Sequence, residues 1–170
     1  MKRILLSAAV LLIGFSASAQ LKIGVNGGLP IGDNSDFYNA NFGADLYYYF
    51  VGADDEFLNI GVASGYSFFA EGDANLGGLA LEVENTQFIP VAAAARINFL
   101  EFLTAGADIG YGIGLNEDVD GGLYYRATAG LDFGPIEVSA FYLAYNIDGV
   151  GGTSALGSLG IGLLYDFEGN

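Results

Sequence analysis

Charged residues are the first candidates for chemistry in this sequence, because several of them interrupt otherwise apolar stretches. Arg96 stands inside the stretch from Val91 to Phe99, and Lys22 and Arg126 have similar surroundings. Carboxylates occur at matching positions of other apolar stretches. Eight residues form this set: Lys22, Asp45, Arg96, Asp108, Arg126, Asp132, Glu137 and Asp166.

Paired carboxylates can act as general acid and base, and a line of charges can carry protons or ions. The chain contains no histidine and no cysteine, which excludes nucleophilic catalysis by Ser-His or Cys-His pairs. Nothing in the sequence marks a substrate cleft, so we expect no enzymatic activity, no cofactor and no metal site. We interpret the set as a structural network of ion pairs, with a proton or ion path as the alternative.

Strict alternation of apolar residues with small or polar ones shows which elements position these charges. A period of two predicts β-strands with one apolar face. The strand at 136–147 has two possible frames: a bulge near Ala140 switches its parity, or its aromatic residues fill one end of the interior. We expect eight strands of about ten residues, at 21–29, 42–50, 58–68, 89–99, 103–113, 123–133, 136–147 and 159–167.

The connections alternate between short and long. Short turns are expected at 52–56, 100–102 and 134–135, and long loops at 31–38, 70–86, 114–122 and 148–155. Residues 33–36 and 116–121 are rich in side chains with oxygen atoms that could bind calcium, but neither segment completes the twelve-residue pattern of a calcium-binding loop. We interpret them as acidic, solvated loop tips, with weak divalent-cation bridging to anionic lipopolysaccharide as the alternative.

The N-terminus has the pattern of a cleaved signal peptide. Lys2 and Arg3 precede an apolar run from Ile4 to Phe15, and a small-x-small motif ends at Ala19. We therefore expect a signal peptide at 1–19 and one domain at 20–170. That domain has three basic and 20 acidic residues, a formal charge of −17, which argues against nucleic acid as a partner.

The whole of residues 20–167 resembles the small eight-stranded outer-membrane β-barrels, the OmpA-like and OmpX-like barrels of Gram-negative bacteria. The resemblance rests on the distributed alternation and on the aromatic ending of the last strand at 165–167. It implies an all-β, eight-stranded, antiparallel up-and-down transmembrane barrel in the outer membrane. The enzymes among outer-membrane barrels rely on histidine, which this chain lacks.

In such a barrel the apolar faces meet lipid and the eight charged residues face a lumen too narrow for an aqueous channel. An arginine turned toward lipid near the midplane would cost about 2–4 kcal/mol. We predict that Lys22 and Asp166 pair across the closing seam, with Arg96 and Asp132 at similar depth. Aromatic girdles are expected at the two membrane interfaces: Tyr48, Phe50, Phe99, Phe133, Tyr165 and Phe167 on the periplasmic side, and Tyr66, Phe68, Tyr111 and Tyr125 on the outer side.

The favoured function is a non-enzymatic outer-membrane barrel with a structural or surface-interaction role. The expected partners are outer-membrane lipid and the export and barrel-assembly machinery; the sequence does not specify a partner for the outer loops. One alternative is a soluble, lipocalin-like barrel around an apolar ligand, whose strands would turn their apolar faces inward. The other alternative is a narrow pore.

Overall fold

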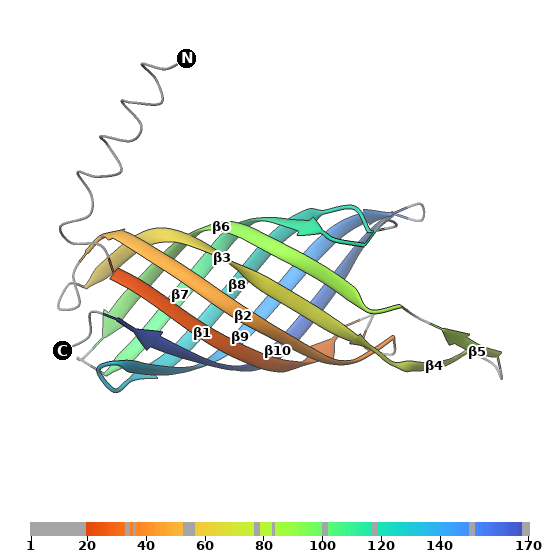
Figure 1. Ribbon diagram of the computed structural model, residues 1–170, viewed down its shortest axis with the longest axis horizontal. Helices are drawn as coiled ribbons and strands as arrows, with labels where there is room; N and C mark the ends of the chain where they lie inside the picture. The colour runs from red at the N-terminus through yellow and green to blue at the C-terminus, as the bar shows by residue number, and fades with distance from the viewer. Residues whose placement is uncertain are drawn as a thin grey trace, which may run out of the picture.

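Eight long antiparallel strands close into a barrel in the computed structural model, which describes residues 20–32, 35, 37–52, 57–76, 79–82, 84–99, 102–116, 119–149 and 152–167 (Figure 1). The expected all-β architecture is thus confirmed. The signal peptide expected at 1–19 lies outside the described residues. Among those residues, no helix is long and apolar enough to cross a membrane. The barrel strands are β1 (Gln20–Ile31), β2 (Tyr38–Val51), β3 (Leu58–Glu71), β6 (Thr86–Phe99), β7 (Leu103–Gly114), β8 (Gly122–Asp132), β9 (Ile136–Gly149) and β10 (Gly152–Asp166).

Strand order follows the chain around the barrel, so the topology is up-and-down. Each barrel strand pairs with the next one along the chain, and β1 pairs with β10 to close the sheet. Between β3 and β6 lies a separate two-stranded hairpin of β4 (Asp73–Leu76) and β5 (Leu79–Glu82). Closure leaves no free edge in the barrel, as a membrane-spanning sheet requires.

The alternation turns apolar side chains outward and polar ones inward. Val25, Ile109 and Ile161 are 60%, 61% and 66% exposed, whereas Lys22 and Arg96 are 8% and 3% exposed. An aqueous barrel would have the reverse orientation. The soluble, ligand-binding alternative therefore does not fit this fold.

Strand β9 keeps one frame along its whole length. Its pairing with β8 and β10 is continuous, with no bulge near Ala140. Phe141, Leu143 and Tyr145 are at most 2% exposed and lie on the inward parity of Glu137. Of the two frames left open by the sequence, the one in which aromatics fill the interior is correct.

The two ends of the barrel differ. At one end, here called the turn end, β1 begins, β10 ends and the short connections lie (Figure 1). The connection from β8 to β9 turns at Gly134, whose φ of 84° few other residues adopt, and the Asp132 carboxylate accepts a 2.8 Å hydrogen bond from the Gly134 N–H. The opposite end, here called the hairpin end, carries β4 and β5 (Figure 1).

Two of the expected long loops contain strand instead. Residues 70–86 hold the β4–β5 hairpin, and residues 148–155 continue β9 and β10, with Gly149 opposite Gly152. Strand that extends beyond the membrane belt needs no apolar alternation, so the sequence pattern does not reveal it. Of the acidic loop tips, residues 33, 34, 36, 117 and 118 lie outside the described residues.

Candidate functional site: the barrel lumen and the hairpin end

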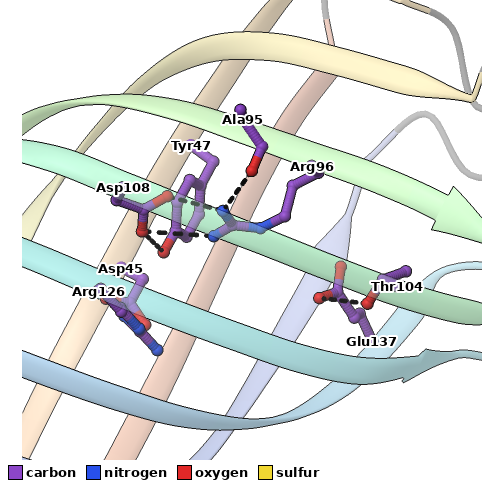
Figure 2. A network of polar contacts seen from close by, with 8 residues as sticks. All are labelled: Asp45, Tyr47, Ala95, Arg96, Thr104, Asp108, Arg126 and Glu137. Carbon is purple, nitrogen blue, oxygen red and sulfur yellow. Dashed lines mark hydrogen bonds and ion pairs between the residues drawn. The ribbon is translucent and has the colours of Figure 1, made fainter.

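An arginine–carboxylate pair lies inside the lumen, on the neighbouring strands β6 and β7. Arg96 Nη1 donates a 2.7 Å hydrogen bond to Asp108 Oδ1, and Arg96 Nη2 lies 3.4 Å from Asp108 Oδ2 (Figure 2). The Tyr47 hydroxyl donates to the same carboxylate at 2.9 Å, and the Arg96 guanidinium lies 4.7 Å from the centre of the Tyr47 ring. A Cβ on Gly106 would overlap the Arg96 side chain, so this glycine provides the room that the pair needs.

A second arginine–carboxylate pair, formed between β8 and β2, makes the same kinds of contact. Arg126 Nη1 donates a 2.8 Å hydrogen bond to Asp45 Oδ1, and Asn26 Nδ2 donates to Asp45 Oδ2 at 2.8 Å. The Arg126 guanidinium lies 4.4 Å from the centre of the Phe141 ring. Each guanidinium therefore has one carboxylate partner and one aromatic face, which offset part of the cost of burying it.

A third group lies toward the turn end, where Lys22 meets three carboxylates. Lys22 Nζ is 3.2 Å from Asp166, 3.8 Å from Glu137 and 4.0 Å from Asp132. The Thr104 hydroxyl donates a 3.3 Å hydrogen bond to Glu137 (Figure 2). The group holds one cation and three carboxylates, so it carries excess negative charge when all are ionised.

The ion pair predicted across the seam is present, since Lys22 and Asp166 are opposite one another in the β1–β10 ladder and form an ion pair. Asp132 joins it, as expected. Arg96 forms its ion pair with Asp108 instead; the two lie diagonally in the β6–β7 ladder, where Arg96 is opposite Gly106 and Asp108 is opposite Ala94. Sequence spacing alone does not give the stagger between distant strands, and depth in the lumen depends on that stagger.

An aromatic layer, which the sequence indicated only for β9, fills the lumen toward the hairpin end. Phe88 stacks on Tyr145 with ring centres 4.2 Å apart, and Phe69 meets both rings edge-on at 6.3 and 6.1 Å. Tyr124 lies 5.0 Å from Tyr145, and Tyr38 lies 5.8 Å from Phe69. Phe69, Phe88, Tyr124 and Tyr145 share the inward parity of the polar and charged residues on their strands, which is the signal that could have identified them. Tyr38 has the opposite parity and lies beyond an irregularity in the β2–β3 pairing between Tyr38 and Ala40, which the sequence pattern does not show.

The ten girdle aromatics all lie on the outward parity of their strands or just beyond a strand end. Tyr165 and Phe167 pack edge-to-face at the turn end, with ring centres 5.2 Å apart. Phe57 and Phe102, which we did not predict, are 64% and 54% exposed at the same end. The ten predicted residues are Tyr48, Phe50, Phe99, Phe133, Tyr165 and Phe167 toward the turn end, and Tyr66, Phe68, Tyr111 and Tyr125 toward the hairpin end.

Amide side chains fasten the root of the β4–β5 hairpin to the barrel. Asn85 Oδ1 accepts a 2.9 Å hydrogen bond from the Glu71 N–H, and Asn39 Nδ2 donates to the Glu71 carbonyl at 3.1 Å. Asn116 Oδ1 accepts from the Gln87 N–H at 3.0 Å, while its Nδ2 donates to the Asn85 carbonyl at 2.9 Å. We call Asn39, Asn85 and Asn116 the amide clamp; it links the hairpin to β2 and to the connection after β7.

The charged side chains that the structure describes in the lumen are held by ion pairs and hydrogen bonds. Within the described part of the chain, no group of three or more Asp, Glu, His or Cys side chains is arranged to hold a metal ion. Where three carboxylates do converge, the Lys22 ammonium lies among them. The arrangement can fix strand register and fill the lumen, which is the chemistry that paired buried charges provide.

Two solved structures of the outer membrane protein Ail of Yersinia pestis resemble the chain. Its backbone structure in a phospholipid bilayer nanodisc has a TM-score of 0.53 at 16% identity, covering 88% of this chain and 100% of that one. This chain has the fold of the outer-membrane β-barrels. The crystal structure of Ail, the attachment invasion locus protein, has a TM-score of 0.50 at 16% identity and covers 88% of this chain and 97% of its own.

At 16% identity the likeness concerns the fold, and no protein-family model and no curated protein matches the chain. The likeness agrees with the physical character of the surface. An outward apolar belt on a closed barrel is the surface of a sheet that spans lipid. Fold and exterior together are those of an outer-membrane β-barrel.

Proposed function

We propose that this barrel is a non-enzymatic surface-interaction protein of the outer membrane, which presents its hairpin end outside the cell. The filled lumen would serve as its structural support. Membrane lipid would surround the apolar belt, and the export and barrel-assembly machinery would deliver and insert the chain.

The observation that carries the proposal is the β4–β5 hairpin. It projects beyond the barrel at the end opposite the short turns (Figure 1). Among the described strands, β4 and β5 pair only with each other, so each offers an unpaired edge. The amide clamp holds the root of this projection in place. A rigidly rooted projection can present a binding surface without the ordering cost of a flexible loop.

The charge of this end also supports a binding role. The four connections at 31–38, 70–86, 114–122 and 148–155 contain ten acidic residues and no lysine or arginine. A surface of one sign attracts partners of the opposite sign and speeds their association. A basic partner fits such a surface. One fold neighbour is named an attachment invasion locus protein, and attachment is the kind of interaction that we propose here.

An attachment assay with a hairpin deletion tests the proposal. Residues 73–82 are replaced by two glycines, and the matched control replaces residues 148–153, at the same end, by two glycines. The unmodified barrel and both variants are expressed in a non-adherent host, and folding is checked by heat-modifiable migration in detergent gels. We expect bacterial retention on basic matrix protein to fall with the first deletion only. Equal retention of all three strains would contradict the role of the hairpin.

The aromatic layer supports a closed lumen rather than the narrow pore. Phe69, Phe88 and Tyr145 are each fully buried and in mutual ring contact across the barrel. We expect no steady conductance when the purified barrel is inserted into planar bilayers. A reproducible single-channel conductance would favour the pore instead.

A further inference from the structure

A hollow of about 330 Å³ lies on the outer surface of the barrel, against β7, β8, β9 and β10. It is separate from the charged residues and the aromatic layer, which lie inside the barrel. Gly130 and Ser139, of inward parity, form part of its lining. The lining side chains of outward parity are all apolar: Leu103, Ala129, Leu131, Val138, Ala140 and Ile161.

Small side chains form the floor of this hollow. Outward alanines occupy two adjacent rows of cross-strand partners, and the rows continue from the hollow onto β6. A floor of methyl groups lies lower than the surrounding surface, where larger side chains project. The first row is Ala105, Ala129 and Ala140, and the second is Ala95, Ala107 and Ala127.

Large side chains border the alanine floor on both sides. Toward the turn end, Leu103, Leu131 and Val138 are opposite one another in the next row. Toward the hairpin end, the rings of Tyr125 and Tyr142 lie 6.0 Å apart at outward positions of β8 and β9. The alanines are therefore the floor of a groove with two walls, which we call the alanine groove.

The dimensions of the alanine groove suit one hydrocarbon chain. Ile97 on β6 and Ile161 on β10 close the two ends of the first row, and they lie four strand spacings apart. At about 4.8 Å per spacing the groove is about 19 Å long, while adjacent rows on one face of a strand are only about 7 Å apart. A groove much longer than it is wide matches an extended acyl chain better than a compact ligand.

We propose that the alanine groove binds one acyl chain of a phospholipid, in the membrane leaflet at the turn end. The outward surface lies in the lipid belt, so hydrocarbon is the medium that covers it. Ala105 is two residues after the start of β7, and Ala140 is four residues after the start of β9. At about 3.3 Å per residue and a strand tilt of about 40°, these alanines lie about 5–10 Å from the turn end of a belt about 25 Å tall. The groove therefore belongs to the leaflet at that end.

The choice of a phospholipid rests on the orientation proposed above, which places the turn end in the periplasmic leaflet. The binding of an acyl chain does not rest on that orientation, because it depends only on the shape and apolar lining of the groove. Accessibility of the hairpin to protease on whole cells tests the orientation separately.

Packing favours a chain that stays in the groove over one that moves past it. Gaps above the alanine methyl groups would forfeit dispersion contacts, and a chain lying along the groove restores them on its floor and on both walls. A second copy of the barrel fits less well. In a two-fold dimer the same surface faces itself, and two grooves face to face would leave a void.

Native mass spectrometry tests the proposal on barrels released from phosphatidylethanolamine nanodiscs into mild detergent. The variant Ala129→Leu with Ala140→Leu fills the groove with side chains that still suit lipid. The matched control is Ala44→Leu on β2, where an exposed outward alanine lies between Val25 and Tyr66. We expect the unmodified barrel and the control to retain one phospholipid and the filled variant to lose it. Equal retention by all three, retention by none, or a dimer that only the filled variant loses would overturn the proposal.

A measurement on the unmodified barrel covers the case in which the filled variant fails to fold. The alanine methyl groups are ¹³C-labelled in an otherwise deuterated barrel, and the acyl chains of the nanodisc carry protons. We expect stronger cross-relaxation with chain methylenes at Ala129 and Ala140 than at Ala44, which faces lipid outside the groove. Equal cross-relaxation at the three positions would show that no chain is held there and would overturn the proposal.

Discussion

At the scale of single residues, parity determines what a side chain can do in this barrel. Arg96 and Ala95 are adjacent in the chain, yet Arg96 lies in a network of ion pairs and Ala95 faces outward. An arginine suits the inward position because its planar fork can bind a carboxylate while its face packs on an aromatic ring, which the ammonium of lysine cannot do as well. The same side chain one residue away would have to enter lipid.

This contrast gives a prediction for β6. Ala95→Arg should impair assembly strongly, because a guanidinium facing lipid costs about 2–4 kcal/mol near the midplane. Asn98→Arg should be tolerated better, since position 98 faces inward opposite Thr104, close to the excess carboxylates around Lys22. Heat-modifiable migration in detergent gels measures the folded fraction of each. Equal yields would contradict the inward and outward assignment of β6.

At the scale of elements, the sequence predicts the strands whose apolar and polar residues alternate, and it does not predict the strands that lack this alternation. All eight barrel strands follow from period-two patterning, and the inward charges follow from the parity of residues such as Arg126 and Asp108. The β4–β5 hairpin and the extension of β9 and β10 do not follow, because beyond the lipid belt both faces of a strand meet water. The sequence also does not predict which charged side chains pair. Arg96 and Asp108, for example, come together because of the β6–β7 register, which the sequence pattern does not specify.

The amide clamp gives a prediction for the hairpin root. Asn116→Ala removes two hydrogen bonds, to the Gln87 N–H and to the Asn85 carbonyl. We expect amide hydrogen exchange to speed up at Gln87 and in β4–β5, at a local cost of about 1–2 kcal/mol, with the central barrel strands unchanged. Asn39→Ala, which removes one bond to Glu71, should have a smaller effect. Unchanged exchange at Gln87 would show that the clamp does not hold the root.

The hairpin also reports the orientation of the barrel in the membrane. Glu71, Glu82 and Glu84 lie within or beside it, so a glutamate-specific protease added to whole cells should cut there. The barrel should survive as a protected fragment, because its strands are hydrogen-bonded all round and covered by lipid. Mass spectrometry of the fragments locates the cut. Cleavage only after permeabilisation of the cells would place the hairpin end in the periplasm.

At the scale of the whole molecule, closing the barrel requires the first and last strands to find each other. Arg126 with Asp45 joins strands that are distant in the chain, and Lys22 with Asp166 joins the seam itself. A slip of one residue at the seam would turn Lys22 and the rest of its strand toward lipid. The interior charges therefore specify a single register, even where desolvation leaves their net contribution to stability small.

The seam pair yields a prediction about closure. Lys22→Met leaves three carboxylates together without their cation and should cost about 3 kcal/mol, the low end for breaking a buried pair, because the Asp132 side chain is 23% exposed. Adding Asp166→Leu removes the carboxylate nearest to Lys22 Nζ, at 3.2 Å, and should recover part of the loss. Recovery stays incomplete because Glu137 and Asp132 remain. Urea midpoints in detergent for the two single variants and the double variant give the coupling. Strictly additive losses would mean that the two side chains do not interact, and the seam would then have to close in a different register.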